Sequence, residues 1–405
     1  MKNEIYKNIF NFNIENDIKL SVSNNEIYNQ LILYIFFSLQ SDLIILVPTL
    51  SDANKLFNNL KTYISNVYIF PEDDYLTKKA IASSDDLLFM RMNFLNSIDT
   101  NDKKILICHV NSFIKKLPAK SEYLSKSIKL SNGQIIDRSE FLKELDSIGY
   151  KKESLVTSVG EYAVRGFVID VYPFQQDHPV RIDFFDNEIS NMSFFDEYSQ
   201  RTIKDEETIL IKPLIDNFNT NVNSIIEYLN KPFTILQDYN QCQNIMKNIV
   251  DQIKYYDNDF SEIFFLNDMK IDKKINIDLI DNTGNYDYVF AAKSIVNCKN
   301  DFDCFLNLIK DQSTYLCTTN VNFIEKVKKS YDKAKIINFD LNSGFIYKDV
   351  TYLSDNDLIE KREKDTFYNY KFGKKIKDIE KLNIGDYVVH KNHGIGIYRG
   401  VSTIT

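Results

Sequence analysis

The stretch Leu43-Ile-Ile-Leu-Val47 decides the fold class, because it is a continuous apolar run of the length of a buried strand. The segment that follows it, residues 51–64, carries apolar residues at helical spacing. Two more apolar runs, residues 67–70 and 104–108, follow helix-like segments. Strands that alternate with helices predict a parallel sheet and an α/β fold for residues 1–117.

Composition excludes several classes of protein. The chain has 405 residues, 44% of them hydrophobic, which predicts a globular protein of more than one domain. With 49 Lys and Arg against 57 Asp and Glu, the net charge of −8 disfavours capture of DNA or RNA by the whole surface. Charged and polar residues interrupt the apolar stretch 31–47, so no membrane span is predicted. Five scattered cysteines predict reduced thiols and a cytoplasmic protein.

A nucleotide site of the phosphate-loop type is not expected. Such a loop needs glycines whose backbone closes around phosphate oxygens, followed by Lys and Ser or Thr. The chain has no glycine before Gly133, and the only Gly-Lys step, Gly373-Lys374, lacks the rest of the pattern. We therefore expect no enzyme activity and no cofactor in these 405 residues.

No catalytic or metal constellation stands out either. The pair His390 and His393 lacks a third ligand, which favours ordinary polar contacts over a metal site. His109, directly after a strand, is typical of a packing residue. The acidic runs 72–74 and 205–207 are interpreted as solvated loops, because nothing near them would position a nucleophile. The predicted catalytic and metal sites are therefore none.

Changes in periodicity and charge predict six segments. Extended runs, including residues 162–172, and a tight hairpin at Asp186-Asn187 indicate an antiparallel insert, and a short helix ends at Gly149. Strand and helix patterns then return, with a helix near 221–229 and a strand at 262–266. Residues 361–405 carry ten basic and five acidic side chains and four clustered glycines. The predicted segments are 1–117, an α/β lobe; 118–205, the insert; 206–270, a continuation of the lobe; 271–360, a small α/β domain; 361–380, a basic linker; and 381–405, the start of a small β-barrel.

Interaction signals lie in the insert. Arg165 and Arg181 fall on extended segments near Phe185, and strand alternation places Arg181 and Phe185 on one face. Arginine beside an exposed aromatic ring is typical of a protein–protein hot spot. Two alternatives remain open: a half-buried face with solvated arginines, or internal ion pairs with the nearby carboxylates of Asp170, Asp183, Asp186 and Glu188.

Two stretches resemble a known family. Residues 161–166 (EYAVRG), 168–173 and 179–189 (PVRIDFFDNEI), with 195–201, closely resemble the insert shared by the excision-repair protein UvrB and transcription-repair coupling factors (Mfd). Residues 385–400 (GDYVVHKNHGIGIYRG) are similar to the start of the RNA-polymerase-interacting domain that these factors share with CarD-type regulators. Both motifs in this order favour the coupling-factor family over UvrB.

The resemblance implies a function and its residues. Residues 1–117 would be a degenerate helicase-like lobe, Arg165, Arg181 and Phe185 would bind UvrA, and Tyr398 and Ile404 in the incomplete barrel would contact the β subunit of RNA polymerase. The chain would be a non-enzymatic adaptor in transcription-coupled nucleotide excision repair. One alternative is a fragment of an ATP- and Mg-dependent DNA translocase whose motor lies beyond residue 405; another is a UvrB-like or CarD-like regulator. DNA would be bound only weakly or through that motor, and no membrane contact is expected.

Overall fold

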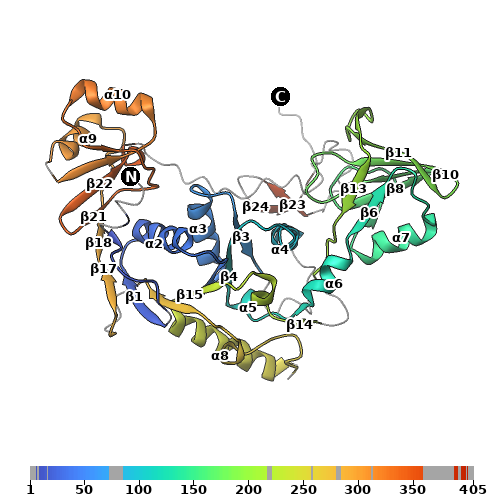
Figure 1. Ribbon diagram of the computed structural model, residues 1–405, viewed down its shortest axis with the longest axis horizontal. Helices are drawn as coiled ribbons and strands as arrows, with labels where there is room; N and C mark the ends of the chain where they lie inside the picture. The colour runs from blue at the N-terminus through green and yellow to red at the C-terminus, as the bar shows by residue number, and fades with distance from the viewer. Residues whose placement is uncertain are drawn as a thin grey trace.

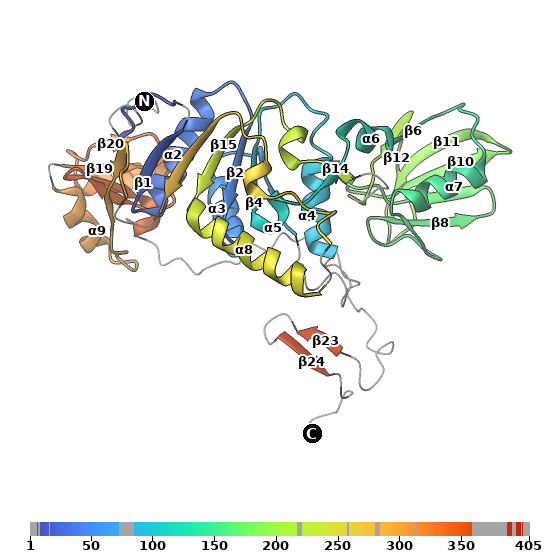
Figure 2. The same cartoon turned by 90° about the horizontal axis from the view of Figure 1, so that it is seen from below.

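The chain forms a central parallel sheet, an antiparallel insert and a small mixed sheet (Figure 1). The insert and the small sheet lie at opposite ends of the central sheet in both views (Figures 1 and 2). Among the described residues, no helix combines the length and apolar character that crossing a bilayer requires. The computed structural model describes residues 6, 9–15, 17–72, 85–216, 221–256, 259–279, 284–311, 313–358, 387–390, 394–397 and 399.

The central sheet confirms the predicted parallel α/β layer. All six neighbouring strand pairs run parallel. The stretch Leu43–Val47 is its strand β2 and is buried along its whole length, as a strand covered on both faces must be. In spatial order the strands are β17 (Tyr288–Phe290), β1 (Ile18–Val22), β16 (Lys274–Asp278), β15 (Phe233–Gln237), β2, β4 (Ile105–His109) and β3 (Val67–Phe70).

Helices cover both faces of this sheet. Leu43, Ile45 and Val47 belong to one buried cluster, with α2 and α3, whereas Ile44 and Leu46 belong to a second, with α4, α5 and α8. The alternation of strand side chains therefore divides the core into two layers. The helices are α2 (Asn25–Ser38), α3 (Leu50–Lys61), α4 (Asp85–Leu95), α5 (Val110–Phe113) and α8 (Tyr239–Tyr256).

The insert leaves the central sheet after β4 and returns to it at β15. Its main sheet is antiparallel except for the parallel pair of β7 and β8, and helix α7 buries Phe141 and Leu145 in the same cluster as that sheet. Two short pairs, β6 with β13 and β5 with β14, join the insert to the rest. The main sheet has the order β12 (Thr202–Asp205), β11 (Glu188–Phe195), β10 (Val180–Phe185), β9 (Val168–Val171), β8 (Glu161–Arg165) and β7 (Lys151–Lys152); the remaining elements are β5 (Leu117–Pro118), α6 (Lys120–Ser125), β6 (Ile128–Ser131), α7 (Arg138–Ser147), β13 (Thr208–Ile211), β14 (Asn221–Asn223) and η2 (Ile225–Tyr228).

Turn chemistry shapes the insert. The predicted hairpin is confirmed: Asp186 has a positive φ of 56° and Phe185 pairs with Glu188 across the turn. Gly149 follows α7 with a φ of +95°, as predicted for a residue that ends a helix. The extended run 162–172 is instead two strands, because Gly166 adopts a φ of +61° and turns the chain between β8 and β9.

The small mixed sheet has helices α9 and α10 on one face. Its other face contributes Phe345 and Tyr352 to the cluster that contains α2 of the central unit. This packing joins the small sheet to the central unit. Its strands are β18 (Ala292–Ser294), β21 (Phe345–Tyr347), β22 (Val350–Ser354), β19 (Thr314–Cys317) and β20 (Ile336–Ile337), and its helices are α9 (Phe302–Ile309), α10 (Val321–Ser330) and η4 (Asp355–Asp357).

A buried carboxyl group strengthens the same contact. The Tyr63 hydroxyl donates to Glu26 Oε1 at 2.5 Å, and the backbone N–H of Asn342 donates to the Tyr63 oxygen at 2.6 Å. Gln30 also donates to Glu26 Oε1, at 2.8 Å. Burial raises the pKa of Glu26, although these hydrogen bonds oppose the shift. The side chain thus links α2 to the small sheet through neutral donors.

Two predicted elements are wrong. The helix near 221–229 is β14 followed by η2, because Ser224 and Glu227 cap a single turn and β14 pairs with β5. The strand at 262–266 joins no sheet. There, the Phe264 N–H donates to the Ile114 carbonyl and Ile263 makes an isolated bridge to Lys115, ahead of the short turn η3 (Leu266–Asp268).

Strand pairing extends past two of the predicted segment boundaries. Strand β13 pairs with β6 of the insert although it follows residue 205, and β16 and β17 complete the central sheet although they follow residue 270. The predicted linker 361–380 lies outside the described residues. Of the predicted barrel, the structure describes one antiparallel hairpin, β23 (Tyr387–His390) with β24 (Gly394–Ile397).

Candidate functional site

The two predicted arginines meet at one buried carboxylate. Asp170 on β9 lies directly opposite Arg181 on β10, and its side chain is only 1% exposed. Arg181 donates from Nε to Asp170 Oδ1 at 2.8 Å and from Nη2 to Oδ2 at 3.0 Å, and Arg165 also donates to Oδ2. These bonds raise the pKa of Arg181. Paired charge of this kind offsets the cost of burying the carboxylate.

Gln200 completes what we call the arginine cluster: Arg165, Arg181, Asp170 and Gln200. Its Oε1 accepts hydrogen bonds from Arg181 Nη2 at 2.9 Å and Arg165 Nη2 at 3.3 Å. The Gln200 backbone has a positive φ of 59° and lies in the turn between β11 and β12. The Arg181 guanidinium also lies 4.2 Å from the centre of the Phe195 ring. The guanidinium groups of Arg165 and Arg181 are therefore both held in fixed orientations.

Phe185 lies on the same face as the cluster. Arg181, Asp183 and Phe185 alternate along β10 with the buried Val180, Ile182 and Phe184, which confirms the predicted alternation. Arg165 shares this face through the cross-strand pairs Arg165–Val168 and Val168–Asp183. The Phe185 side chain is 78% exposed, so the face offers a large apolar group beside fixed cations.

The two arginines differ in how far they are committed to internal ion pairs and how far they are exposed. Asp170 does hold both arginines in internal pairs, as the structural alternative supposed. The Arg165 side chain nevertheless remains 47% exposed, whereas that of Arg181 is 22% exposed. Arg165 can therefore meet a partner directly, and Arg181 chiefly fixes the cluster.

The sequence did not predict that two apolar side chains, Phe167 and Ile135, are exposed next to this face. Phe167 and Ile135 are 62% and 79% exposed, and Ile135 bridges to Glu188 beside the hairpin turn. The Arg138 guanidinium lies 5.3 Å from the centre of the Phe167 ring. The signal was present in Gly166-Phe167, because a tight turn leaves its aromatic residue outside the core.

A second charged cluster is buried where the insert returns to the central sheet. Asp216 Oδ2 lies 2.6 Å from Arg91 Nε and 3.0 Å from Lys115 Nζ, and Lys115 Nζ lies 2.5 Å from Glu72 Oε2. Burial favours neutral Asp216, but Lys115 and Arg91 outweigh it and hold its pKa well below the usual 3.8. Glu72 is thus buried rather than solvated. His109 is a packing residue as predicted: it is buried, and its Nε2 accepts from the Glu72 N–H at 3.1 Å.

The edge of the sheet where a phosphate loop would lie is already occupied by the chain. Thr49 caps α3, which follows β2, and Asp52 reaches back to the Thr49 N–H at 3.3 Å while the Asp52 N–H donates to Thr49 Oγ1 at 3.2 Å. A carboxylate therefore stands where an anion would bind.

We expect purified residues 1–405 to show no saturable ATP binding, because Asp52 repels phosphate and blocks the helix terminus. Titration of a fluorescent ATP analogue with magnesium measures this. Saturable binding that an excess of unlabelled ATP displaces would contradict the prediction.

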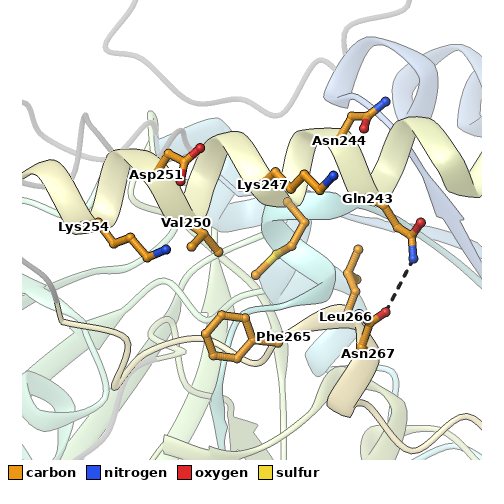
Figure 3. A pocket seen from close by; sticks show the side chains of 10 residues that line it. Gln243, Asn244, Lys247, Val250, Asp251, Lys254, Phe265, Leu266 and Asn267 are labelled. Atoms are coloured by element: carbon orange, nitrogen blue, oxygen red, sulfur yellow. Dashed lines mark hydrogen bonds between the residues drawn. The ribbon is translucent and has the colours of Figure 1, made fainter.

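A groove runs along α8 on the central unit (Figure 3). It has a volume of about 500 Å³, and Met246, Val250, Phe265 and Leu266 supply its apolar lining. Lys247, Asp251 and Lys254 border it, and Gln243 Nε2 donates to Asn267 Oδ1 at 3.5 Å. These side chains include no nucleophile paired with a base, so the groove offers no catalytic constellation.

Two family models match parts of this chain. A family model described as the UvrB interaction domain matches residues 128–216, which contain the arginine cluster and Phe185. A second, described as the CarD-like/TRCF RID domain, matches residues 382–405. The predicted polymerase-contacting residues Tyr398 and Ile404 fall in this match but lie outside the described residues.

Curated relatives agree with both matches. The transcription-repair-coupling factor of Staphylococcus haemolyticus (strain JCSC1435) is 23% identical over 90% of this chain and 40% of the relative. Those of Staphylococcus aureus (strain USA300) and Staphylococcus epidermidis (strain ATCC 12228 / FDA PCI 1200) are 23% and 21% identical over 89% of the chain. The chain spans about 40% of the length of these relatives. The predicted resemblance is confirmed: the chain is similar to a part of the transcription-repair-coupling factors and carries a UvrB interaction domain and a CarD-like/TRCF RID match.

Proposed function

We propose that the chain is an adaptor that recruits UvrA to RNA polymerase in transcription-coupled nucleotide excision repair. The observation that carries this proposal is the open face of the insert, where Arg165 and Phe185 are exposed on a sheet matched by the UvrB interaction domain. The CarD-like/TRCF RID match of residues 382–405 supports a polymerase contact there, and the β subunit is the contact that we propose. No step of this role needs chemistry from the described residues.

Fixed geometry supports docking at the arginine cluster. Ordering a free arginine on binding costs about 0.5–1.5 kcal/mol, and here Asp170 and Gln200 have already ordered both guanidiniums. The exposed ring of Phe185 supplies apolar area next to them. Arginine and aromatic side chains arranged in this way are the residue types that contribute most at protein interfaces.

A second candidate function is suggested by the share of the relatives' length that the chain covers. The chain covers about 40% of the length of its relatives, and this second proposal treats the adaptor as one part of a longer protein in which an ATP-dependent DNA translocase would supply movement. In that case magnesium and ATP would act only in the motor, and DNA contact would come from it as well. The adaptor surface would serve the same partner in either arrangement.

The exposed ring provides the direct test of UvrA binding. We expect Phe185→Ala to weaken binding of purified UvrA at least about tenfold, because the ring is desolvated on docking and is not needed by the core. Isothermal titration calorimetry measures the affinity, and circular dichroism confirms that the melting temperature is unchanged.

A matched control is Tyr255→Ala, which removes an 82% exposed ring from α8 on the central unit. UvrA affinity should stay at the level of the parent chain. If both substitutions weaken UvrA binding equally, or if neither weakens it, the UvrA surface lies elsewhere.

A further inference from the structure

A histidine and two carboxylates meet at the open end of the β10–β11 hairpin. His178 stands two residues before β10, and Asp196 and Glu197 follow β11 directly. Antiparallel pairing brings the two ends together, and the Phe195 N–H donates to the Pro179 carbonyl at 3.0 Å. One ligand atom from each of His178, Asp196 and Glu197 lies within 4.8 Å of the others.

The buried member of this group lacks a hydrogen bond. The Glu197 side chain is 5% exposed, and its Oε2 has no hydrogen-bond partner. His178 Nδ1 is equally buried and equally unpartnered. The two atoms are 3.6 Å apart, which is too long for a hydrogen bond. A buried carboxylate oxygen left in this state costs stability, so the arrangement calls for a bound group.

The separation suits two ligands of one metal ion. Donor atoms that each lie about 2.1 Å from a shared ion are about 3.0–3.6 Å apart. The third ligand is held in advance, because Asp196 Oδ1 accepts from the Ser199 N–H at 2.6 Å and the Tyr198 N–H at 3.2 Å. Such bonds orient a ligating carboxylate before the ion arrives. His178 is partly exposed, which leaves an open side for water ligands.

We propose that His178, Asp196 and Glu197 bind one divalent first-row transition-metal ion, with Zn²⁺ and Mn²⁺ as the suitable ions. One imidazole nitrogen with two carboxylates matches the ligand preference of these ions. Mg²⁺ and Ca²⁺ prefer oxygen ligands only and should bind less well. The sequence conceals the site, because the histidine and the acidic pair are brought together only by the register of the hairpin.

The ion would fix the turn that supports the arginine cluster. The Glu197 carbonyl accepts a hydrogen bond from Gln200 Nε2 at 3.0 Å, and Gln200 Oε1 contacts both arginines. Residues 196–200 therefore connect the metal ligands to that cluster within one turn. An effect of the ion on UvrA binding would rest on the proposed function, whereas metal binding itself is independent of it.

Calorimetry on the full chain after removal of metals with EDTA tests the site. A Cys304→Ser background removes a pair of neighbouring thiols that could also take up Zn²⁺, because Cys304 Sγ and Cys298 Sγ are only 2.9 Å apart. We expect one Zn²⁺ or Mn²⁺ per chain, and at least about tenfold weaker binding in His178→Asn and in Glu197→Gln. Asp183→Asn, which removes a carboxylate of the same sheet outside the site, should leave the affinity unchanged.

A measurement on the chain with its three ligands intact covers the case in which a variant fails to fold. Bound Mn²⁺ should broaden the NMR signals most strongly at His178 and residues 196–200 and progressively less with distance from them. Absence of Mn²⁺ and Zn²⁺ binding, unchanged affinity in both ligand variants, or broadening centred on another part of the chain would overturn the proposal. If the parent chain binds the metal ion but does not bind UvrA, only the proposed function is contradicted.

Discussion

Asp216→Ala is expected to lower the free energy of unfolding by about 3–5 kcal/mol, the usual cost of removing one partner from a buried ion pair. The substitution leaves Arg91 and Lys115 buried with Glu72 as their remaining carboxylate in the cluster. Urea unfolding followed by circular dichroism and by tyrosine fluorescence measures the loss. Two probes are needed, because a chain of several domains need not unfold in one step.

The pH dependence has a defined sign. The folded-state pKa of Asp216 is lowered, so its contribution is fully present above the unfolded value near 3.8 and is completely lost only as the pH falls through the lowered folded-state value. The loss caused by Asp216→Ala should therefore be largest at pH 7 and should shrink steadily as the pH falls below 3.8. A matched control is Asp99→Ala, which breaks the exposed pair with Lys212 and should cost at most about 1 kcal/mol. Equal losses in the two variants would contradict the argument.

The second large effect distinguishes the two arginines. Arg181→Ala should cost about 2 kcal/mol of folding stability, because Arg165 alone remains to pair the buried Asp170. It should also weaken UvrA binding by about 2 kcal/mol or more, roughly thirtyfold, since the neighbouring guanidinium loses its support. Arg165→Ala should weaken binding by a similar amount but change stability by less than about 1 kcal/mol.

Calorimetric affinity and thermal melting of the same samples separate these outcomes. Rescue by Arg181→Lys should be poor, because an ammonium group cannot reproduce the paired bonds from Nε and Nη2 to Asp170. If both alanine variants bind UvrA like the parent chain, the arginine cluster is structural only. If Arg181→Ala leaves the melting temperature unchanged, the internal pair contributes nothing to the fold.

The sequence predicted those elements that are determined by residues adjacent in the chain, such as apolar runs, turn residues and residues that end helices. The apolar run 43–47 indicated a buried strand, and Asp186-Asn187 and Gly149 were sufficient for a turn and a helix end. The strand at 262–266 failed because its apolar residues pack beside Ile114 and Lys115 without a neighbouring strand. Strand β16 was missed although Ile275 and Ile277 alternate with polar residues.

The candidate site shows a different limit. The sequence identified Arg165, Arg181 and Phe185, and alternation placed two of them on one face. It could not choose Asp170 among the nearby carboxylates, since that choice depends on the register between β9 and β10. The turn at Gly166, which the unbroken run 162–172 concealed, likewise sets the register between β8 and β9 that brings Arg165 to the same face. Long-range pairing, rather than residue type, therefore sets the geometry of the site.

The point where the insert leaves the parallel sheet has a consequence for how such a protein can be rebuilt. Strands β4 and β15 both run parallel to β2, so the chain departs at the carboxyl end of β4 and returns at the amino end of β15, on the opposite edge of the sheet. Keeping the order of the seven strands without the insert would therefore need a crossover of about a dozen residues or more, the length that parallel strands require. With that crossover in place, the insert is a cassette that could be excised or exchanged for another while the parallel sheet keeps folding.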